Sequence, residues 1–319
     1  MVNVAYEWLR DCWPPKPEFL PKDYPDLTGK TILITGANTG IGFESAKALL
    51  KKNATVVFAN RSEEKTKIAI AKIQAELGGD SSQRSIFVKT DLSDLSSIKG
   101  TAEELKSKGI TKLHYTILNA GVMQPPKGSK TKQGFELQIG TNVLGHQLLQ
   151  KFLTPLVLNA VSSDFTPRVV WLASAAHLSS PPNGGIDWDS FRNADWAGTV
   201  SAYGQSKTGN IYQAYIYAQQ HKDVISVSAH PGYLASDLTR AYKGYLQYLM
   251  KLLMSPPVYG SYTELFAALS PKVTLKESGR YIGPWGQFRE LRDDVQEGLT
   301  DGTAQKLWDW AEAEIRPYT

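Results

Sequence analysis

A strand-like run that leads through a glycine-rich turn into a helix constrains the fold most strongly. Residues 31–34 form a short apolar run, as expected of a buried parallel strand. The stretch 35–42 follows at once, with Gly36, Gly40 and Gly42, and a helical pattern continues to residue 50. Glycines at these places permit a tight turn and a close approach to phosphates, and the helix N-terminus offers N–H donors. The segment therefore predicts a nucleotide-binding strand–turn–helix unit.

Strand and helix patterns then alternate along the chain. Strand-like runs lie at 55–59, 85–89, 113–118, 168–173, 225–229 and 280–282, and helical patterns at 94–106, 134–158, 202–220 and 303–315. This alternation predicts an α/β fold, a Rossmann-type doubly wound parallel sheet of about seven strands with helices on both faces. We expect one domain at 28–319, preceded by an aromatic, proline-rich arm at 1–27 with a short helix near 4–11.

Composition excludes several classes of function. The 319 residues carry a formal net charge of +4 with scattered basic side chains, so no nucleic-acid partner is expected. Cys12 is the only cysteine, which excludes an intrachain disulfide. Glu7, Arg10 and Asp11 stand where a signal peptide would need an apolar run. No uncharged stretch approaches the roughly 20 apolar residues of a membrane span. We therefore expect no membrane span and a cytoplasmic location.

The residue after the second strand is expected to select the cofactor. A carboxylate there would bind the ribose 2′-hydroxyl of NAD and repel the 2′-phosphate of NADP. The chain has Asn60 and Arg61 at this place, with no acid before Glu63. A guanidinium can hold a phosphate through two hydrogen bonds, so Arg61 predicts NADP(H), although an ordinary surface arginine is the alternative. Ser62 is placed to cap the helix that follows.

Tyr203 and Lys207 stand four residues apart at the start of a predicted helix, so both lie on one helical face. A lysine charge about 5 Å from a phenol favours the phenolate by roughly 3 kcal/mol at an effective dielectric of about 20. The pattern predicts a lowered pKa for Tyr203 and a role in general acid–base chemistry. A packed tyrosine beside a solvated lysine is the alternative for this pair alone.

Taken together, these pieces resemble the classical short-chain dehydrogenase/reductase family from about residue 27 onward. Besides the glycine-rich turn and the Tyr203/Lys207 pair, the matching pieces are Asp91-Leu92, Asn119-Ala120-Gly121, Asn142, Ser174 and Pro231-Gly232. Arg61, Ser174 with His177, and a long interval before Tyr203 that contains residues 184–189 are similar to the retinol-dehydrogenase and WW-domain-oxidoreductase branch. No WW domain is present, and the N-terminal arm is similar to that of fungal members.

The resemblance implies hydride transfer between NADP(H) and a carbonyl or alcohol. It makes Tyr203 the general acid in reduction and the general base in oxidation. Lys207 would lower the pKa of Tyr203 and hydrogen-bond to the nicotinamide ribose, and Ser174 would donate a hydrogen bond to the substrate oxygen. It also makes Asn142 the holder of a water that links Lys207 to solvent, although an asparagine inside a helix can instead bond its own backbone. The implied cofactor contacts are Gly36, Asn38, Thr39, Gly40, Ile41, Gly42, Arg61, Asp91, Leu92, Asn119, Ala120, Gly121, Tyr203, Lys207, Pro231, Gly232, Leu234 and Ser236.

His177 and His230 invite a metal assignment. No cysteine or carboxylate accompanies them at ligand spacing in the sequence. We therefore expect packed or capping histidines and no metal site.

The substrate is expected to contact a loop at about 233–256. Its part from residue 238 to residue 254 is amphipathic and rich in tyrosine, leucine and methionine. As a lid it indicates an apolar aldehyde or ketone; as ordinary core it says nothing of the substrate, and contact with a membrane surface is a third alternative. The family resemblance also implies that the reaction runs as a reduction by NADPH, because cytoplasmic NADP pools are generally kept reduced. Oxidation of a retinol- or steroid-like alcohol, and an NADP-binding sensor without turnover, remain the alternatives, and the sequence does not give the oligomeric state.

Overall fold

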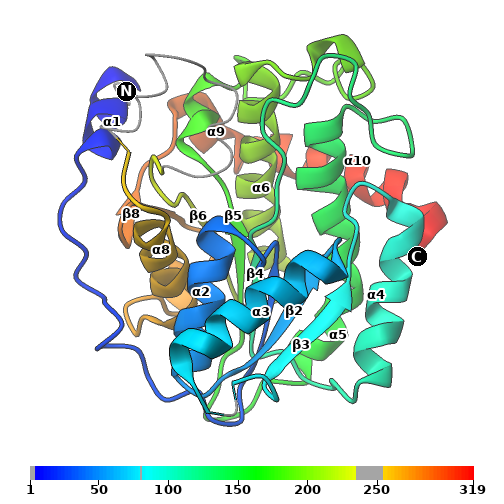
Figure 1. Ribbon diagram of the computed structural model, residues 1–319. Coiled ribbons are helices and arrows are strands. Elements are labelled where there is room, and N and C mark those ends of the chain that lie inside the picture. The colour runs from blue at the N-terminus through cyan, green and yellow to red at the C-terminus, as the bar shows by residue number, and fades with distance from the viewer. Residues whose placement is uncertain (1–3, 80, 235–253) are drawn as a thin grey trace.

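The computed structural model describes residues 4–79, 81–234 and 254–319, and within them a central sheet organises the chain (Figure 1). Its strand order is β3-β2-β1-β4-β5-β6-β7-β8. The first seven strands are parallel, and β8 is antiparallel to β7. The strands are β1 Thr31–Thr35, β2 Thr55–Asn60, β3 Ser85–Lys89, β4 Tyr115–Leu118, β5 Arg168–Leu172, β6 Ile225–Ala229, β7 Tyr281–Gly283 and β8 Gln287–Arg289.

Helices cover both faces of the sheet, which confirms the doubly wound fold. The α-helices are α1 Val4–Cys12, α2 Gly40–Lys51, α3 Glu63–Leu77, α4 Leu95–Ser107, α5 His146–Leu158, α6 Val200–Gln220, α8 Pro257–Leu269, α9 Asp293–Gly298 and α10 Thr303–Ile315. One hydrophobic cluster packs α4, α5, α6 and α10 on one face, and another packs α2 and α8 on the other. Alternate residues of β1 feed the two clusters: Leu33 enters the first, and Ile32 and Ile34 enter the second.

Several elements differ from the sequence prediction, and one of them is helix α9, which was not predicted. The helix expected from residue 134 begins as a π-helix at Ile139–Gly145 and becomes α-helical only at His146. Strand β8 was not predicted, because three residues after a tight turn carry no periodic signal. Helix α8 was missed because it is buried almost all round and so lacks a polar face, although Pro257 occupies the favoured first helical position.

Helix α1 lies beside β8 and is attached to it through charged side chains (Figure 1). The Glu7 carboxylate is 3.1 Å from a guanidinium nitrogen of Arg289, and Asp11 is 3.4 Å from Nε2 of His230. The Trp8 and Tyr233 rings lie 6.4 Å apart. The short helix expected near residues 4–11 is therefore present, and it contacts segments more than 200 residues away.

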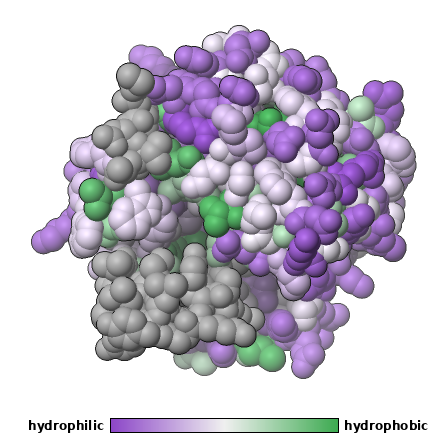
Figure 2. Space-filling view, turned by 90° about the horizontal axis from the view of Figure 1, so that it is seen from above, coloured by the Kyte–Doolittle hydropathy of each residue, from purple (hydrophilic) through white to green (hydrophobic). Residues whose placement is uncertain are grey.

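The surface seen in Figure 2 is mainly hydrophilic over the described residues, with hydrophobic side chains exposed in small separate patches. In the described part of the chain, every helix is too short or too polar to cross a membrane.

Glu264 on α8 generates a prediction about stability. It is fully buried, accepts a hydrogen bond from the Ser45 hydroxyl of α2 at 2.5 Å, and burial raises its pKa to about 8. Because this folded-state pKa lies above the ordinary value of 4.5, the stability that the neutral carboxyl provides is complete below pH 4.5 and is lost as the pH rises toward 8. Replacement by glutamine keeps the shape and removes the titration.

We expect wild type to lose about 2–4 kcal/mol of unfolding free energy relative to Glu264→Gln between pH 5 and pH 8. Urea unfolding at a series of pH values measures this difference. The exposed Glu64 of α3 gives the control, since Glu64→Gln should follow the wild-type curve. Parallel curves for wild type and Glu264→Gln would contradict the prediction.

Candidate active site

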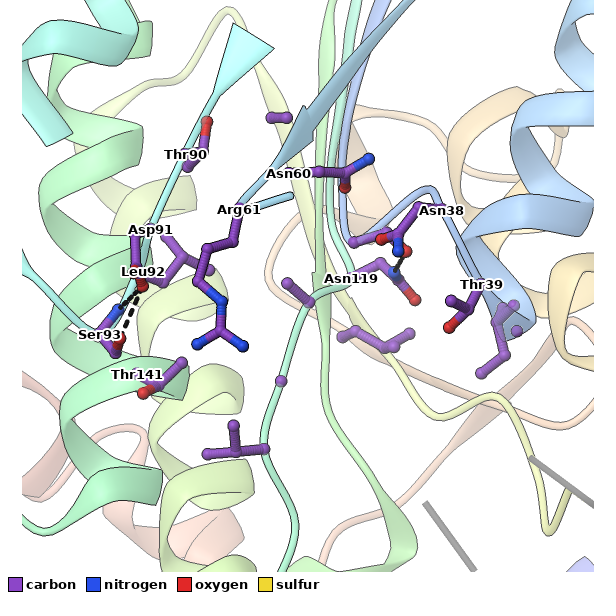
Figure 3. Close-up of a pocket in the computed structure, with 18 of the residues that line it drawn as sticks. Asn38, Thr39, Asn60, Arg61, Thr90, Asp91, Leu92, Ser93, Asn119 and Thr141 are labelled. Carbon is purple, nitrogen blue, oxygen red and sulfur yellow. Dashed lines mark hydrogen bonds between the residues drawn. The ribbon is translucent and has the colours of Figure 1, made fainter. Parts of the chain in front are cut away.

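A cavity of about 370 Å³ opens where β1, β2, β3 and β4 end (Figure 3). Eleven of the predicted cofactor residues line it, from four separate segments of the chain. They are Gly36, Asn38, Thr39, Gly40, Ile41, Arg61, Asp91, Leu92, Asn119, Ala120 and Gly121. Ala59, Asn60, Thr90, Ser93, Val122, Leu137, Thr141 and Leu172 complete the lining. The cavity lies at the carboxyl ends of the strands, where open α/β sheets bind ligands.

The glycine-rich turn is fastened to the end of β4. Nδ2 of Asn119 donates to the carbonyls of Thr35 and Gly36, at 2.7 and 3.3 Å. Gly36 has a φ of +71°, and a Cβ on Gly42 would lie 2.6 Å from both Asn119 Nδ2 and the Gly36 oxygen. Glycine is therefore required at both positions. Gly42 packs against the turn and does not line the cavity.

The end of β2 provides a second hydrogen bond that holds the glycine-rich turn, and it also provides a guanidinium group. Oδ1 of Asn60 accepts from the Ala37 amide at 2.9 Å, which fixes the turn against β2. Arg61 is exposed, and Figure 3 shows its guanidinium extending into the cavity. Within the described ranges, no acid pairs with it. The role of Asn60 in holding the turn was not predicted, because its only signal in the sequence is a polar residue at the end of a buried strand.

Ser174, Tyr203 and Lys207 meet beside the end of β5. Ser174 directly follows β5 and Ala173. Its hydroxyl accepts from the Ala176 amide at 3.1 Å and also interacts with the Tyr203 phenol on α6. Lys207 Nζ donates to the carbonyl of Leu172 at 2.6 Å and lies 5.7 Å from the centre of the Tyr203 ring. A Cβ on Gly121 would be 3.6 Å from this nitrogen, so the group adjoins the cavity at Gly121.

The ionisation of this pair corrects the sequence prediction. Burial raises the pKa of Tyr203 to about 12, and only its hydrogen bond with Ser174 opposes the rise. Burial also lowers the pKa of Lys207 to about 7. The prediction that Lys207 lowers the pKa of Tyr203 is therefore wrong for the protein alone. The reason is that the same burial disfavours both charged forms, and that the ammonium points at the Leu172 carbonyl.

Asn142 lies in the π-helix and bonds to another segment rather than to its own helix. Its Oδ1 accepts from the Val122 amide at 2.9 Å, and its Nδ2 donates to the Val122 carbonyl at 3.0 Å and to Ser206 at 2.9 Å. The side chain thus joins α6 to the loop after β4. Its own carbonyl accepts from His146 and Asn210, which the sequence analysis did not consider.

Pro231, Gly232 and Leu234 lie after β6 and do not line the cavity. Gly232 has a φ of +90°, and Leu234 is buried. Ser236 and residues 238–253 of the expected lid fall outside the described residues. His177 Nδ1 bonds to the Ser174 carbonyl at 2.9 Å, and burial lowers the pKa of this histidine to about 4. His230 lies beside Asp11, a contact that sequence spacing does not reveal.

The fit of Gly42 predicts a measurable cost of adding one methyl group. Gly42→Ala should lower the free energy of unfolding by about 1–3 kcal/mol, because the new Cβ overlaps Asn119 and the Gly36 carbonyl. Gly100 of α4 is the matched control, because nothing lies within 4 Å of a Cβ there, and Gly100→Ala should stabilise by up to about 1 kcal/mol. Chemical denaturation of both variants tests this; equal effects would show that the turn has room.

Comparison with known proteins agrees with this geometry. The family model described as "short chain dehydrogenase" matches residues 30–185. A short-chain dehydrogenase/reductase of Phomopsis amygdali is 35% identical over 334 residues, which cover 98% of this chain and 99% of that protein. One of Armillaria gallica is 35% identical over 99% of this chain and 100% of its own length.

Solved structures share the fold. An uncharacterized protein from Mycobacterium Paratuberculosis superposes with a TM-score of 0.69 at 26% identity, covering 93% of this chain and 97% of that one. A short chain dehydrogenase from Escherichia coli CFT073 complexed with NADPH has a TM-score of 0.61 at 20% identity, with 84% and 99% covered. A 3-ketoacyl-(acyl-carrier-protein) reductase from Brucella melitensis complexed with NADH has a TM-score of 0.59 at 19% identity, with 81% and 98% covered. With the full-length identity to the fungal proteins, these likenesses establish that the chain belongs to the short-chain dehydrogenase/reductase family of oxidoreductases.

Proposed function

We propose that this oxidoreductase is an NADP(H)-dependent carbonyl reductase in which Asn142, Ser174, Tyr203 and Lys207 form the catalytic group. The observation that carries the proposal is that the Ser174 hydroxyl interacts with the Tyr203 phenol, while the Lys207 ammonium lies 5.7 Å from the centre of the Tyr203 ring. Two hydroxyls that converge in this way can both bond to one carbonyl oxygen. Ser174 would stabilise charge on that oxygen, and Tyr203 would donate the proton that completes the alcohol.

The cavity residues fit a nicotinamide dinucleotide. The glycine-rich turn and the N-terminus of α2 offer the phosphate site, the residues after β3 and β4 the adenine and ribose sides, and Lys207 a bond to the nicotinamide ribose. The bound cofactor would supply the hydride. The likenesses to NADPH and NADH complexes do not separate the two cofactors. Arg61 supports NADP, because its guanidinium extends into the cavity, has no acidic partner among the described residues, and would be available to a 2′-phosphate.

The substrate part of the proposal is an apolar aldehyde or ketone, and it rests on the sequence of the expected lid alone. Assay of a panel of aldehydes and ketones with NADPH, followed by the loss of NADPH absorbance, tests it. Turnover of alcohols with NADP⁺ only would indicate the oxidative alternative. Inactivity with intact NADPH binding would indicate a cofactor-binding sensor.

Arg61 provides a direct test of the cofactor. Arg61→Ala should weaken NADPH binding roughly 10- to 100-fold, because a charge-assisted contact worth about 1.5–3 kcal/mol is lost, and should change NADH binding little. Calorimetric titration of both cofactors measures this. Lys67→Ala, on the exposed side of α3, is the control and should leave both affinities unchanged. Wild-type protein that binds NADH as tightly as NADPH would rule out the assignment.

Tyr203 provides the test of the acid. Tyr203→Phe should reduce kcat by about 100-fold or more, since proton donation is lost while volume and cofactor contacts are kept. Tyr215→Phe, on the same helix, should retain wild-type kcat. Steady-state kinetics, with NADPH affinity and melting temperature as controls for folding, measure both variants. A rate close to wild type for Tyr203→Phe would mean that another residue is the acid.

A further inference from the structure

A chain of hydrogen-bonded side chains runs from Lys207 through the core to helix α10. Lys207 Nζ donates to Asn210 Oδ1 at 3.3 Å, and Asn210 Nδ2 donates to Gln213 Oε1 at 3.0 Å. Gln213 Nε2 donates to Gln147 Oε1 at 2.8 Å, and Gln147 Nε2 donates to Glu312 Oε1 at 3.0 Å. All four bonds point the same way, from an ammonium to a carboxylate.

Backbone carbonyls determine which way the amides face. The Asn142 carbonyl accepts from Asn210 Nδ2 at 2.7 Å, and the Val143 carbonyl accepts from Gln213 Nε2 at 2.9 Å. A carbonyl only accepts, so the NH₂ group of each amide must face it. The oxygen of Asn210 is thereby turned toward Lys207. Both carbonyls belong to the π-helix.

Burial makes this orientation matter. Asn210, Gln213 and Gln147 are at most 2% exposed, and Lys207 is 3% exposed. A buried ammonium needs acceptors, and in the described part of the chain those that bond to Lys207 are the Leu172 carbonyl and Asn210. The titratable groups that interact with it are Tyr203 on its own helix and His146 on α5, and neither brings a negative charge near neutrality.

We propose that Asn210 is the positioning residue of Lys207, and that Gln213, Gln147 and Glu312 hold its oxygen toward the ammonium. The aligned amide dipoles stabilise the charged form of the lysine, and the carboxylate of Glu312, partly exposed on α10, ends the chain. A role in the reaction rests on the proposed function, because it requires Lys207 to act beside Tyr203. The effect on Lys207 itself does not depend on any substrate.

Two substitutions at Asn210 should move the lysine in opposite directions. Asn210→Leu removes an acceptor, so the pKa of Lys207 should fall from about 7 by roughly half a unit to one unit. Asn210→Asp places a carboxylate oxygen where Asn210 Oδ1 accepts from Lys207 Nζ, so the pKa of Lys207 should rise by about 1–3 units. Protein labelled with ¹³C-lysine reports the titration by NMR, with the Lys207 signal assigned from its loss in Lys207→Met.

Further variants separate this effect from general damage to the core. Gln213→Leu should shift Lys207 downward by less than Asn210→Leu does. Gln150→Leu is the matched control, because Gln150 is an equally buried amide of α5 that bonds to Tyr217 and should leave the Lys207 titration unchanged. If Asn210→Leu fails to fold, Asn210→Ala removes the same acceptor without introducing a larger apolar group.

The NMR titration of Lys207 tests the role of Asn210 without any measurement of catalysis. If the pKa of Lys207 shifts in the same direction in Asn210→Leu and Asn210→Asp, or does not shift, the role of Asn210 is overturned. If Gln213→Leu leaves this pKa unchanged, the role of Gln213, Gln147 and Glu312 is overturned. The pH dependence of kcat/KM for carbonyl reduction should move with the lysine in each variant. If wild type reduces no carbonyl, the proposed function fails, while the NMR result still stands for or against Asn210.

Discussion

The bond between the Lys207 ammonium and the Leu172 carbonyl is the contact on which the site depends. It joins α6 to the last residue of β5, and β5 is held on both sides by β4 and β6. Tyr203 lies one turn earlier on the same helix, so the bond also sets the phenol beside Ser174. The chemistry proposed for the pair is therefore built on an interior strand of the sheet.

Neighbouring strand ends satisfy each other's polar groups around this centre. Asn119 after β4 bonds to the turn after β1, Asn60 at the end of β2 bonds to Ala37, and Asn142 bonds to Val122. Buried amides are costly unless they are paired, so these bonds also specify one arrangement of the rim. Arg61 differs, because it extends into the cavity without an acidic partner among the described residues.

Burial explains why the ionisation of the pair departs from what spacing alone suggests. Desolvation opposes the phenolate of Tyr203 and the ammonium of Lys207 alike, and it acts on both because α6 lies in the core. The amide chain through Asn210 partly offsets this for the lysine.

The sequence by itself determined the strand–helix alternation, the glycine-rich turn and the positions of Arg61, Ser174, Tyr203 and Lys207, since local periodicity and short motifs carry these. It also predicted that these residues lie toward the carboxyl ends of the strands, where open α/β sheets bind ligands. Tertiary structure alone decided the ionisation of Tyr203, the π-helix that turns the Asn142 carbonyl toward Asn210, and the contact of Asp11 with His230. These depend on burial and on residues distant in the chain, and no local pattern records either.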